Sequence, residues 1–254
     1  MRRILILGGT LEARRLAERL RGRADVAVTL SLAGRTAAPA AQPVPVRVGG
    51  FGGAEGLAAY LRAERVVALI DATHPYAAAI SANAARAAAV ADVRLLAVRR
   101  PPWQPIAGDR WTEVADVRAA VHALGSAPRH VFLALGRKEL GPFAAAPQHH
   151  YLVRSVDPVD PPLPVPHATY LVARGPFAEG PERDLLIAHA IDVIVAKNSG
   201  GEATYGKIAA ARALGIEVVL LRRPHLPPAP SVAGVEEAVA WLDHALASVA
   251  ARGV

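Results

Sequence analysis

Two distant stretches of the sequence repeat the same order of residue types. Residues 68–101 (ALIDATHPYAAAISANAARAAAVADVRLLAVRRP) and 192–224 (DVIVAKNSGGEATYGKIAAARALGIEVVLLRRP) each run from an apolar stretch through a polar loop and an alanine-rich stretch to a second apolar stretch and Arg-Arg-Pro. Upstream of each, a further apolar stretch enters glycine, in ILILGGTLEARRLAE and in VFLALGRKELGPFAA. Internal similarity of this kind predicts two related units within one chain.

Hydrophobic periodicity predicts strands and helices in alternation. The expected strands cover residues 3–7, 26–30, 66–70, 93–98, 130–135, 169–173, 192–196 and 216–221, and the expected helices cover 11–21, 54–62, 77–89, 113–124, 202–213 and 235–250. Alternation favours parallel sheets covered by helices, so we expect an α/β fold of two Rossmann-like parallel-sheet domains that face each other across a cleft. A single continuous sheet is the alternative.

The expected domains are residues 1–100 and 101–254, with a linker at about 101–128 counted in the second domain. The prolines of RRPPWQPIAGDRW mark the join. A chain of 254 residues is long enough to bury a substantial core in each half.

Composition excludes several classes of function. The chain has no cysteine, which excludes disulfides and thiolate metal sites, so redox chemistry must come from a bound cofactor. No metal-ligand spacing is present, His149-His150 included, and we expect no metal. We find no long apolar run and no leader pattern, and therefore expect a cytoplasmic protein without membrane contact.

The formal net charge is +7, and arginine supplies most of the positive charge. Arginine suits the recognition of carboxylate and phosphate groups, although a general bias toward arginine explains the charge equally well. Aromatic residues are only 5% of the chain and there is no lysine-rich stripe, so we expect no nucleic-acid partner.

The first apolar stretch ends in Gly8, Gly9 and Thr10 and leads into an expected helix. Backbone N–H groups at such a turn, together with the positive end of the helix dipole, suit a pyrophosphate. The full G-x-G-x-x-G pattern is absent, and a plain tight turn is the alternative.

The second expected strand ends at Ser31 and continues to Gly34, Arg35 and Thr36. A dinucleotide-binding unit reads the adenosine ribose at this place, with an acidic residue for NAD or an arginine for a 2′-phosphate. These residues favour NADPH over NADH. The alternative is that Arg35 is an ordinary solvated cation.

Two polar loops follow matching strands in the two halves. DATHPYA offers His74 and Tyr76, and KNSGGEATYGK offers Lys197, Asn198 and Tyr205. Side chains at the carboxyl ends of parallel strands are well placed for ligands. A structural histidine in a His-Pro turn is the alternative interpretation of His74.

Arginines beside glycine or at strand ends form a further candidate group, namely Arg137, Arg154 and Arg174. As a set around one cleft they suit a substrate with many carboxylates, whereas each one alone is typical of a surface ion pair.

Taken together, the sequence resembles the precorrin-6A reductase and cobalt-precorrin-6A reductase family of cobalamin biosynthesis. The resemblance covers nearly the whole chain, through ILGGTLEARRLA, SLAGRT, DATHPYAAAISANA, RRPPW, GRKEL, RGPF, KNSGGEATYGKIAAAR and RRP in the family's order. It implies that NADPH reduces one double bond of a ring-contracted tetrapyrrole to give precorrin-6B, without flavin or metal redox. Neighbouring pathway enzymes are potential partners.

The expected site has three parts. Cofactor-binding residues are Gly8, Gly9, Thr10, Glu12, Ser31, Gly34, Arg35, Thr36, Thr73 and His74. Residues expected to bind the anionic tetrapyrrole are Arg137, Arg154, Arg174, Lys197, Asn198, Ser199, Gly200 and Gly201. Candidate proton donors are His74, Tyr76, Lys197 and Tyr205.

Two other functions fit the same residues. A two-domain transferase that uses a sugar nucleotide leaves Arg35 without a specific task, and a non-catalytic nucleotide sensor uses only the basic surface. The sequence does not distinguish a cobalt-containing from a cobalt-free tetrapyrrole.

Overall fold

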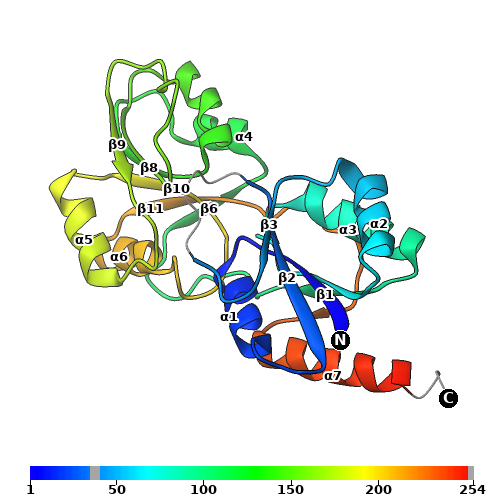
Figure 1. Cartoon of the computed structure of the whole chain (residues 1–254). Coiled ribbons are helices and arrows are strands. Elements are labelled where there is room, and N and C mark those ends of the chain that lie inside the picture. The colour runs from blue at the N-terminus through cyan, green and yellow to red at the C-terminus, as the bar shows by residue number, and fades with distance from the viewer. Residues whose placement is uncertain (35–40, 251–254) are drawn as a thin grey trace. The chain divides into compact units, whose positions relative to one another are not determined.

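The computed structural model describes residues 1–34 and 41–250 and divides the chain into two compact units (Figure 1). The first unit is Met1–Pro101 together with Pro224–Val254, and the second is Pro102–Arg223. Each unit contains one six-stranded sheet in which all neighbouring strands are parallel. The expected α/β fold of two parallel sheets with covering helices is confirmed.

The first sheet has the strand order β12-β5-β4-β1-β2-β3. Its unit contains β1 (Arg2–Leu7), α1 (Leu11–Leu20), β2 (Val26–Leu32), β3 (Val46–Val48), α2 (Gly53–Ala63), β4 (Val66–Asp71), α3 (Ala78–Ala91), β5 (Arg94–Val98), β12 (Ser231–Val232) and α7 (Val235–Ala250).

The second sheet has the strand order β6-β11-β10-β7-β8-β9. Its unit contains β6 (Trp111–Val114), α4 (Val117–Ala123), β7 (His130–Ala134), the 3-10 turns η1 (Arg137–Glu139) and η2 (Gly141–Ala145), β8 (His150–Ser155), β9 (Ala168–Val172), α5 (Glu179–Ala188), β10 (Val193–Lys197), α6 (Gly206–Leu214) and β11 (Glu217–Leu221).

The two sheets match position by position, with β1, β4 and β5 equivalent to β7, β10 and β11, which confirms the internal similarity. The edge strands are exchanged along the chain. After β5 the chain forms β6 of the second sheet, and after β11 it returns to form β12 beside β5. The sequence predicted residues 101–254 as the second domain, whereas in the structure Pro224–Val254 packs within the first unit.

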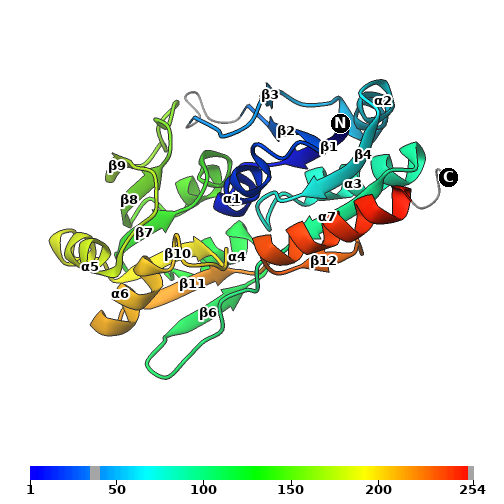
Figure 2. The same cartoon turned by 60° about the horizontal axis from the view of Figure 1, so that its bottom comes forward.

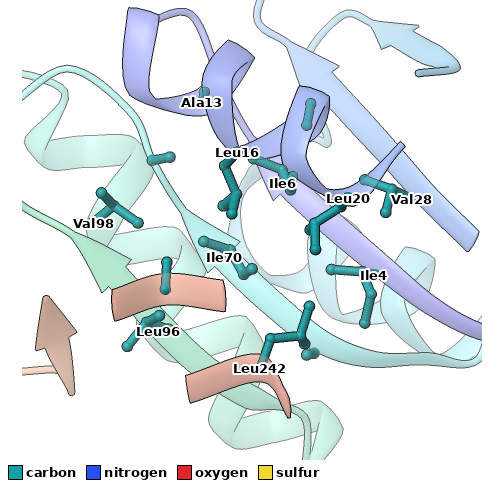
Figure 3. Packing of buried hydrophobic residues seen from close by; sticks show 14 of the residues in the cluster. Ile4, Ile6, Ala13, Leu16, Leu20, Val28, Ile70, Leu96, Val98 and Leu242 are labelled. Carbon is teal, nitrogen blue, oxygen red and sulfur yellow. The ribbon is translucent and has the colours of Figure 1, made fainter. Parts of the chain in front are cut away.

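Alternate residues of the first sheet point to opposite faces, and each face is covered by a pair of helices. Ile4, Ile6 and Ile70 pack against α1 and α7, as Figure 3 shows, with Leu242 supplied by α7. The opposite face packs on α2 and α3. Figure 2 shows α1 and α7 side by side. The C-terminal segment therefore belongs to the first unit, because α7 covers the apolar face formed by β1 and β4.

The sequence missed the short strands β3, β6 and β12, as well as β8 and α5. It also predicted a helix over 113–124, where β6 ends at Val114 and α4 begins only after Asp116. The carboxylate of Asp116 accepts a hydrogen bond from Ala119 N at 2.9 Å, which caps the helix there. Edge strands of two to four residues carry too little periodicity to be detected. None of the helices in the part of the chain described has the length and apolarity to cross a membrane.

Candidate functional site

The turn between β1 and α1 is held in place by backbone and packing contacts. Gly8 N donates to Ser31 O at 2.9 Å, which joins the turn to the end of β2. A Cβ on Gly8 would lie 2.6 Å from Leu30 Cδ1, and Gly9 has a φ of 110°, a conformation that favours glycine. Both glycines are therefore required by the shape of the turn.

Thr10 is the N-cap of α1. Its hydroxyl accepts from Ala13 N at 3.1 Å and donates to Ala72 O at 2.7 Å. The hydroxyl thus fastens the turn to the end of β4. Thr10 thus fixes the start of the helix, whose N-terminal amides favour an anion.

A cavity of about 180 Å³ lies at the carboxyl ends of β1, β2 and β4 in the first unit. It brings together Gly8, Ser31 and Thr73, which the sequence had placed in one cofactor site. Apolar side chains and glycines form most of its wall. The lining residues are Leu7, Gly8, Ser31, Ala33, Gly49, Gly50, Phe51, Gly52, Gly53, Leu57, Thr73, Ile80 and Asn83. Arg35 and Thr36 lie outside the described residues, which resume after Gly34 at residue 41.

Sequence reasoning missed the glycine-rich loop that forms one wall of this cavity, residues 49–53 (GGFGG). Arg47 donates to Gly49 O at 2.6 Å and to Gly50 O at 2.8 Å, and its guanidinium carbon lies 3.7 Å from the ring centre of Phe51. A Cβ on Gly56 would lie only 1.7 Å from Phe51 O, so α2 can approach the loop only through a glycine. Four glycines within five residues were the sequence signal that could have identified this loop.

Sequence reasoning also assigned no role to Asp71, the last residue of β4. Its carboxylate is buried and accepts hydrogen bonds from Thr73 and Ser81. Asp71 therefore shapes the loop that carries Thr73 to the cavity.

Glu12 lies in the first turn of α1 and pairs with Arg100, with 2.5 Å between Oε2 and the guanidinium nitrogen. Both side chains are largely buried, at 21% and 15% exposed. The pairing neutralises the carboxylate at the start of α1, where an unpaired negative charge would oppose a bound phosphate. Its position supports a positioning role for Glu12.

His74 and Tyr76 lie together in the loop between β4 and α3, with ring centres 5.6 Å apart. Tyr76 N donates to His74 Nδ1 at 3.3 Å. This hydrogen bond leaves the proton of the neutral imidazole on Nε2. The next residue toward the N-terminus is Thr73, so His74 follows the cavity wall directly.

In the second unit, Lys197 ends β10 and its Nζ lies 2.6 Å from Glu139 Oε1. Asn198 binds the backbone of Trp103 twice: Oδ1 accepts from Trp103 N at 2.8 Å and Nδ2 donates to Trp103 O at 3.0 Å. Trp103 Nε1 donates to Gly201 O at 2.8 Å. The KNSGG loop therefore anchors the segment that follows Pro102.

Arg154 is buried and pairs with Glu182, with Nη2 2.8 Å from Oε2. Its guanidinium carbon lies 3.8 Å from the ring centre of Phe177 and 4.8 Å from that of Phe132. A guanidinium enclosed in this way is committed to the core of the unit. We therefore remove Arg154 from the residues proposed to bind a substrate.

Tyr205 is also engaged within the second unit. Its hydroxyl accepts a hydrogen bond from Arg212, and its ring centre lies 5.7 Å from that of Trp103. Nearby Lys207 is buried and donates to Thr204 O at 2.6 Å. Burial lowers the pKa of Lys207 to about 7.

Arg137 and Arg174 are exposed and follow the carboxyl ends of β7 and β9. Arg137 donates to Pro158 O at 3.3 Å. Because β7, β9 and β10 are strands of one parallel sheet, these arginines and Lys197 lie along the same edge. Over residues 1–34 and 41–250, no set of three or more His, Asp or Glu side chains is arranged to hold a metal ion.

The family model described as precorrin-6x reductase CbiJ/CobK matches residues 3–243. This chain belongs to the precorrin-6x reductase family. A precorrin-6A reductase of Sinorhizobium sp is 57% identical over 96% of this chain and 94% of its own length. A solved structure described as CobK precorrin-6A reductase is 51% identical, with a TM-score of 0.91 and coverage of 96% of this chain and 97% of that one.

More distant members of the precorrin-6x reductase family carry a different name. A cobalt-precorrin-6A reductase of Priestia megaterium is 28% identical over 93% of this chain and 96% of its own length. Membership of the family makes this chain an oxidoreductase, which requires a reductant. The tetrapyrrole reductase resemblance seen in the sequence is therefore confirmed.

Proposed function

We propose that this chain reduces one double bond of precorrin-6A to precorrin-6B in cobalamin biosynthesis, with NADPH as the hydride donor, in the cytoplasm. One observation carries the cofactor assignment: the cavity beside Gly8 that Ser31 and Thr73 share at the carboxyl ends of three parallel strands. Open parallel sheets bind nucleotides at this place.

The residues around this cavity fit a phosphorylated dinucleotide. The Gly8–Gly9 turn and the first amides of α1 suit the pyrophosphate, and Glu12 is neutralised by Arg100. No carboxylate is among the described residues that line the cavity, and Ser31, the second-to-last residue of β2, lies near the place where NAD sites have an acidic residue. Arg35 remains the predicted partner of the 2′-phosphate.

Bound NADPH would supply the hydride, and the neighbouring carbon of the macrocycle would take a proton. Of the four candidate acids, Lys197 pairs with Glu139 and Tyr205 accepts from Arg212 in the second unit. His74 follows Thr73 in the first unit, and Tyr76 N fixes its neutral tautomer with the proton on Nε2. We therefore assign proton donation to His74, with Tyr76 as the residue that orients it.

The second unit would bind the acidic arms of the tetrapyrrole. Arg137, Arg174 and Lys197 supply positive charge at the carboxyl edge of its sheet, and Ser199, Gly200 and Gly201 offer a close approach to backbone. Asn198 acts by holding Trp103.

We further propose that the natural substrate is the cobalt-free form. Identity is 57% to the Sinorhizobium precorrin-6A reductase but 28% to the Priestia cobalt-precorrin-6A reductase, at similar coverage. The specificity constants for the two substrates test this directly. A higher kcat/KM for cobalt-precorrin-6A would reverse the assignment.

The proposed reaction is tested by following NADPH oxidation together with the absorption spectrum of precorrin-6A. We expect one equivalent of NADPH to be consumed for each precorrin-6A. Turnover with neither form of the tetrapyrrole would rule the proposal out. Thermal stabilisation by a uridine diphosphate sugar, but not by NADPH, would favour the transferase alternative instead.

A further inference from the structure

The loop that follows β10 has several backbone carbonyls held by side chains of its own unit. Arg223 Nε donates to Asn198 O at 2.8 Å, and Arg223 Nη2 donates to Ser199 O at 3.0 Å. Further along the loop, Lys207 Nζ donates to Thr204 O at 2.6 Å. Three carbonyl oxygens of this loop are therefore bound to side chains that carry basic groups.

The backbone N–H groups of residues 200–204 (GGEAT) show the opposite pattern. None of them donates a hydrogen bond to any group within residues 1–34 and 41–250, whereas the carbonyls of residues 201–204 all accept one. Gly200 and Gly201 have φ of 66° and 71°, a left-handed conformation that favours glycine. The hydrogen-bonding groups left over in this segment are mostly donors, and an array of backbone donors suits an anion.

Arg223 controls which way the peptide groups at the start of this segment point. The C=O and N–H of a trans peptide group lie on opposite sides of it. Because the Ser199 carbonyl is turned toward the guanidinium, the N–H of Gly200 in the same peptide group is directed away from it. Without Arg223, the carbonyls of Asn198 and Ser199 would be free to turn and present acceptors in place of donors.

We propose that Arg223 is a positioning residue of the tetrapyrrole site: by holding the carbonyls of Asn198 and Ser199, it makes residues 200–204 present amide donors to a carboxylate arm of the substrate. The inference rests on the proposed binding of the tetrapyrrole by this loop. Glu202, the acidic residue of the segment, is exposed, so water and salt screen its charge. Arg223 needs no contact with the substrate in this role, unlike Arg137 and Arg174.

The test measures kcat and KM for precorrin-6A in variants of the full chain, with NADPH as the reductant. Arg223→Met should raise KM by roughly tenfold or more and change kcat only a few fold, because the amide donors bind the substrate before and during the reaction alike. The dissociation constant of NADP⁺ should stay unchanged. Arg222→Met is the matched control: it removes the same charge from an exposed neighbour and should leave KM within about twofold.

A double variant separates positioning from direct contact with the substrate. Gly201→Ala places a side chain at a φ of 71°, which should distort the same loop and raise KM by itself. If Arg223 acts through the loop, the double variant Arg223→Met, Gly201→Ala should have a KM close to that of the worse single variant. Arg223→Lys keeps the charge but donates from a single nitrogen, and should raise KM by roughly threefold.

The outcomes separate this inference from the proposed function. An unchanged KM in Arg223→Met, or an equal rise in Arg222→Met, overturns the inference and leaves the reduction of precorrin-6A in place. Increases in KM that multiply in the double variant also overturn it, because Arg223 would then act independently of the loop. Where Arg223→Met does not fold, Arg223→Lys decides, and a wild-type KM in that variant overturns the positioning role. A wild type that oxidises no NADPH with either tetrapyrrole overturns both.

Discussion

The two sheets share one strand order but use the carboxyl ends of their strands differently. In the first unit, β1, β2 and β4 end around a cavity lined mostly by glycines and apolar side chains, with Ser31, Thr73 and Asn83 as its polar residues. In the second unit, Glu139 after β7 pairs with Lys197 at the end of β10, with 2.6 Å between Oε1 and Nζ. Repeated topology thus predicts where a site can form, whereas the residues after each strand decide whether that place stays open.

The equivalent strands β4 and β10 make this contrast concrete. Asp71 ends β4 and accepts a hydrogen bond from Thr73, which lines the cavity, while Lys197 ends β10 and is followed by Asn198, which holds the Trp103 backbone. The first loop borders a cavity, whereas the second binds other parts of its own unit. This difference favours the first unit for the proposed nucleotide binding, although the sequence repeats.

The largest expected effect comes from closing the cavity wall. Gly56→Ala would bring a Cβ within 1.7 Å of Phe51 O and displace the glycine-rich loop, so we expect calorimetry to show no NADP⁺ binding. Gly206→Ala is the matched change in the second unit, where the Cβ would lie 2.4 Å from Phe177 O. NADP⁺ affinity should survive it. Equal losses in the two variants would contradict the division of roles.

The next effect concerns the buried charges of the second unit. Arg154→Met leaves Glu182 buried without its partner, and we expect a loss of about 3–5 kcal/mol in the free energy of unfolding by urea denaturation. The double variant Arg154→Met, Glu182→Leu should recover most of that loss. A raised KM for the tetrapyrrole at unchanged stability would return Arg154 to the substrate site.

A smaller effect is expected for proton donation. His74→Gln should lower kcat by about a hundredfold and leave the dissociation constant of NADP⁺ unchanged, because the acid acts only during the reaction. Tyr205→Phe, in the second unit, should change kcat by only a few fold. A kcat for His74→Gln within a few fold of the wild type would mean that solvent supplies the proton.

The places of the glycine turn, Ser31 and Thr73 were predictable because each lies at or just beyond the end of an apolar strand, so local sequence carries the signal. The pairing of Arg154 with Glu182 and the return of α7 to the first unit were not, because both depend on residues far away along the chain. The loop of residues 49–53 was missed since β3 before it has only three residues. Asp71 was overlooked because its role consists of accepting hydrogen bonds from Thr73 and Ser81, which the sequence pattern does not reveal.

The next smaller effect concerns the selectivity between NADPH and NADH. Arg35→Ala should weaken NADPH binding by about tenfold and NADH binding hardly at all, because the lost charge would act only on the 2′-phosphate. Arg118→Ala, an exposed arginine of α4 in the second unit, removes the same charge and should leave both affinities unchanged. Equal weakening of both cofactors would take Arg35 out of this role.

The smallest effect is the pH dependence of stability from Lys207. Burial lowers its pKa from the usual 10.5 to about 7, so between these values the unfolded chain binds more protons than the folded one. Stability should therefore rise with pH above about 7, by at most about 1.4 kcal/mol per pH unit. Lys207→Met should flatten this slope in urea denaturation at pH 7 and pH 8.5. An unchanged slope would refute the prediction.

The exchange of edge strands between the sheets has a consequence for biosynthesis. The second unit is one continuous segment, Pro102–Arg223, whereas the first is built from both ends of the chain. During translation the second unit can fold as soon as it leaves the ribosome. The first sheet must wait for β12 and α7, which emerge after the whole second unit and cover its apolar face. Nucleotide binding should therefore appear only after residues 231–250 have been synthesised.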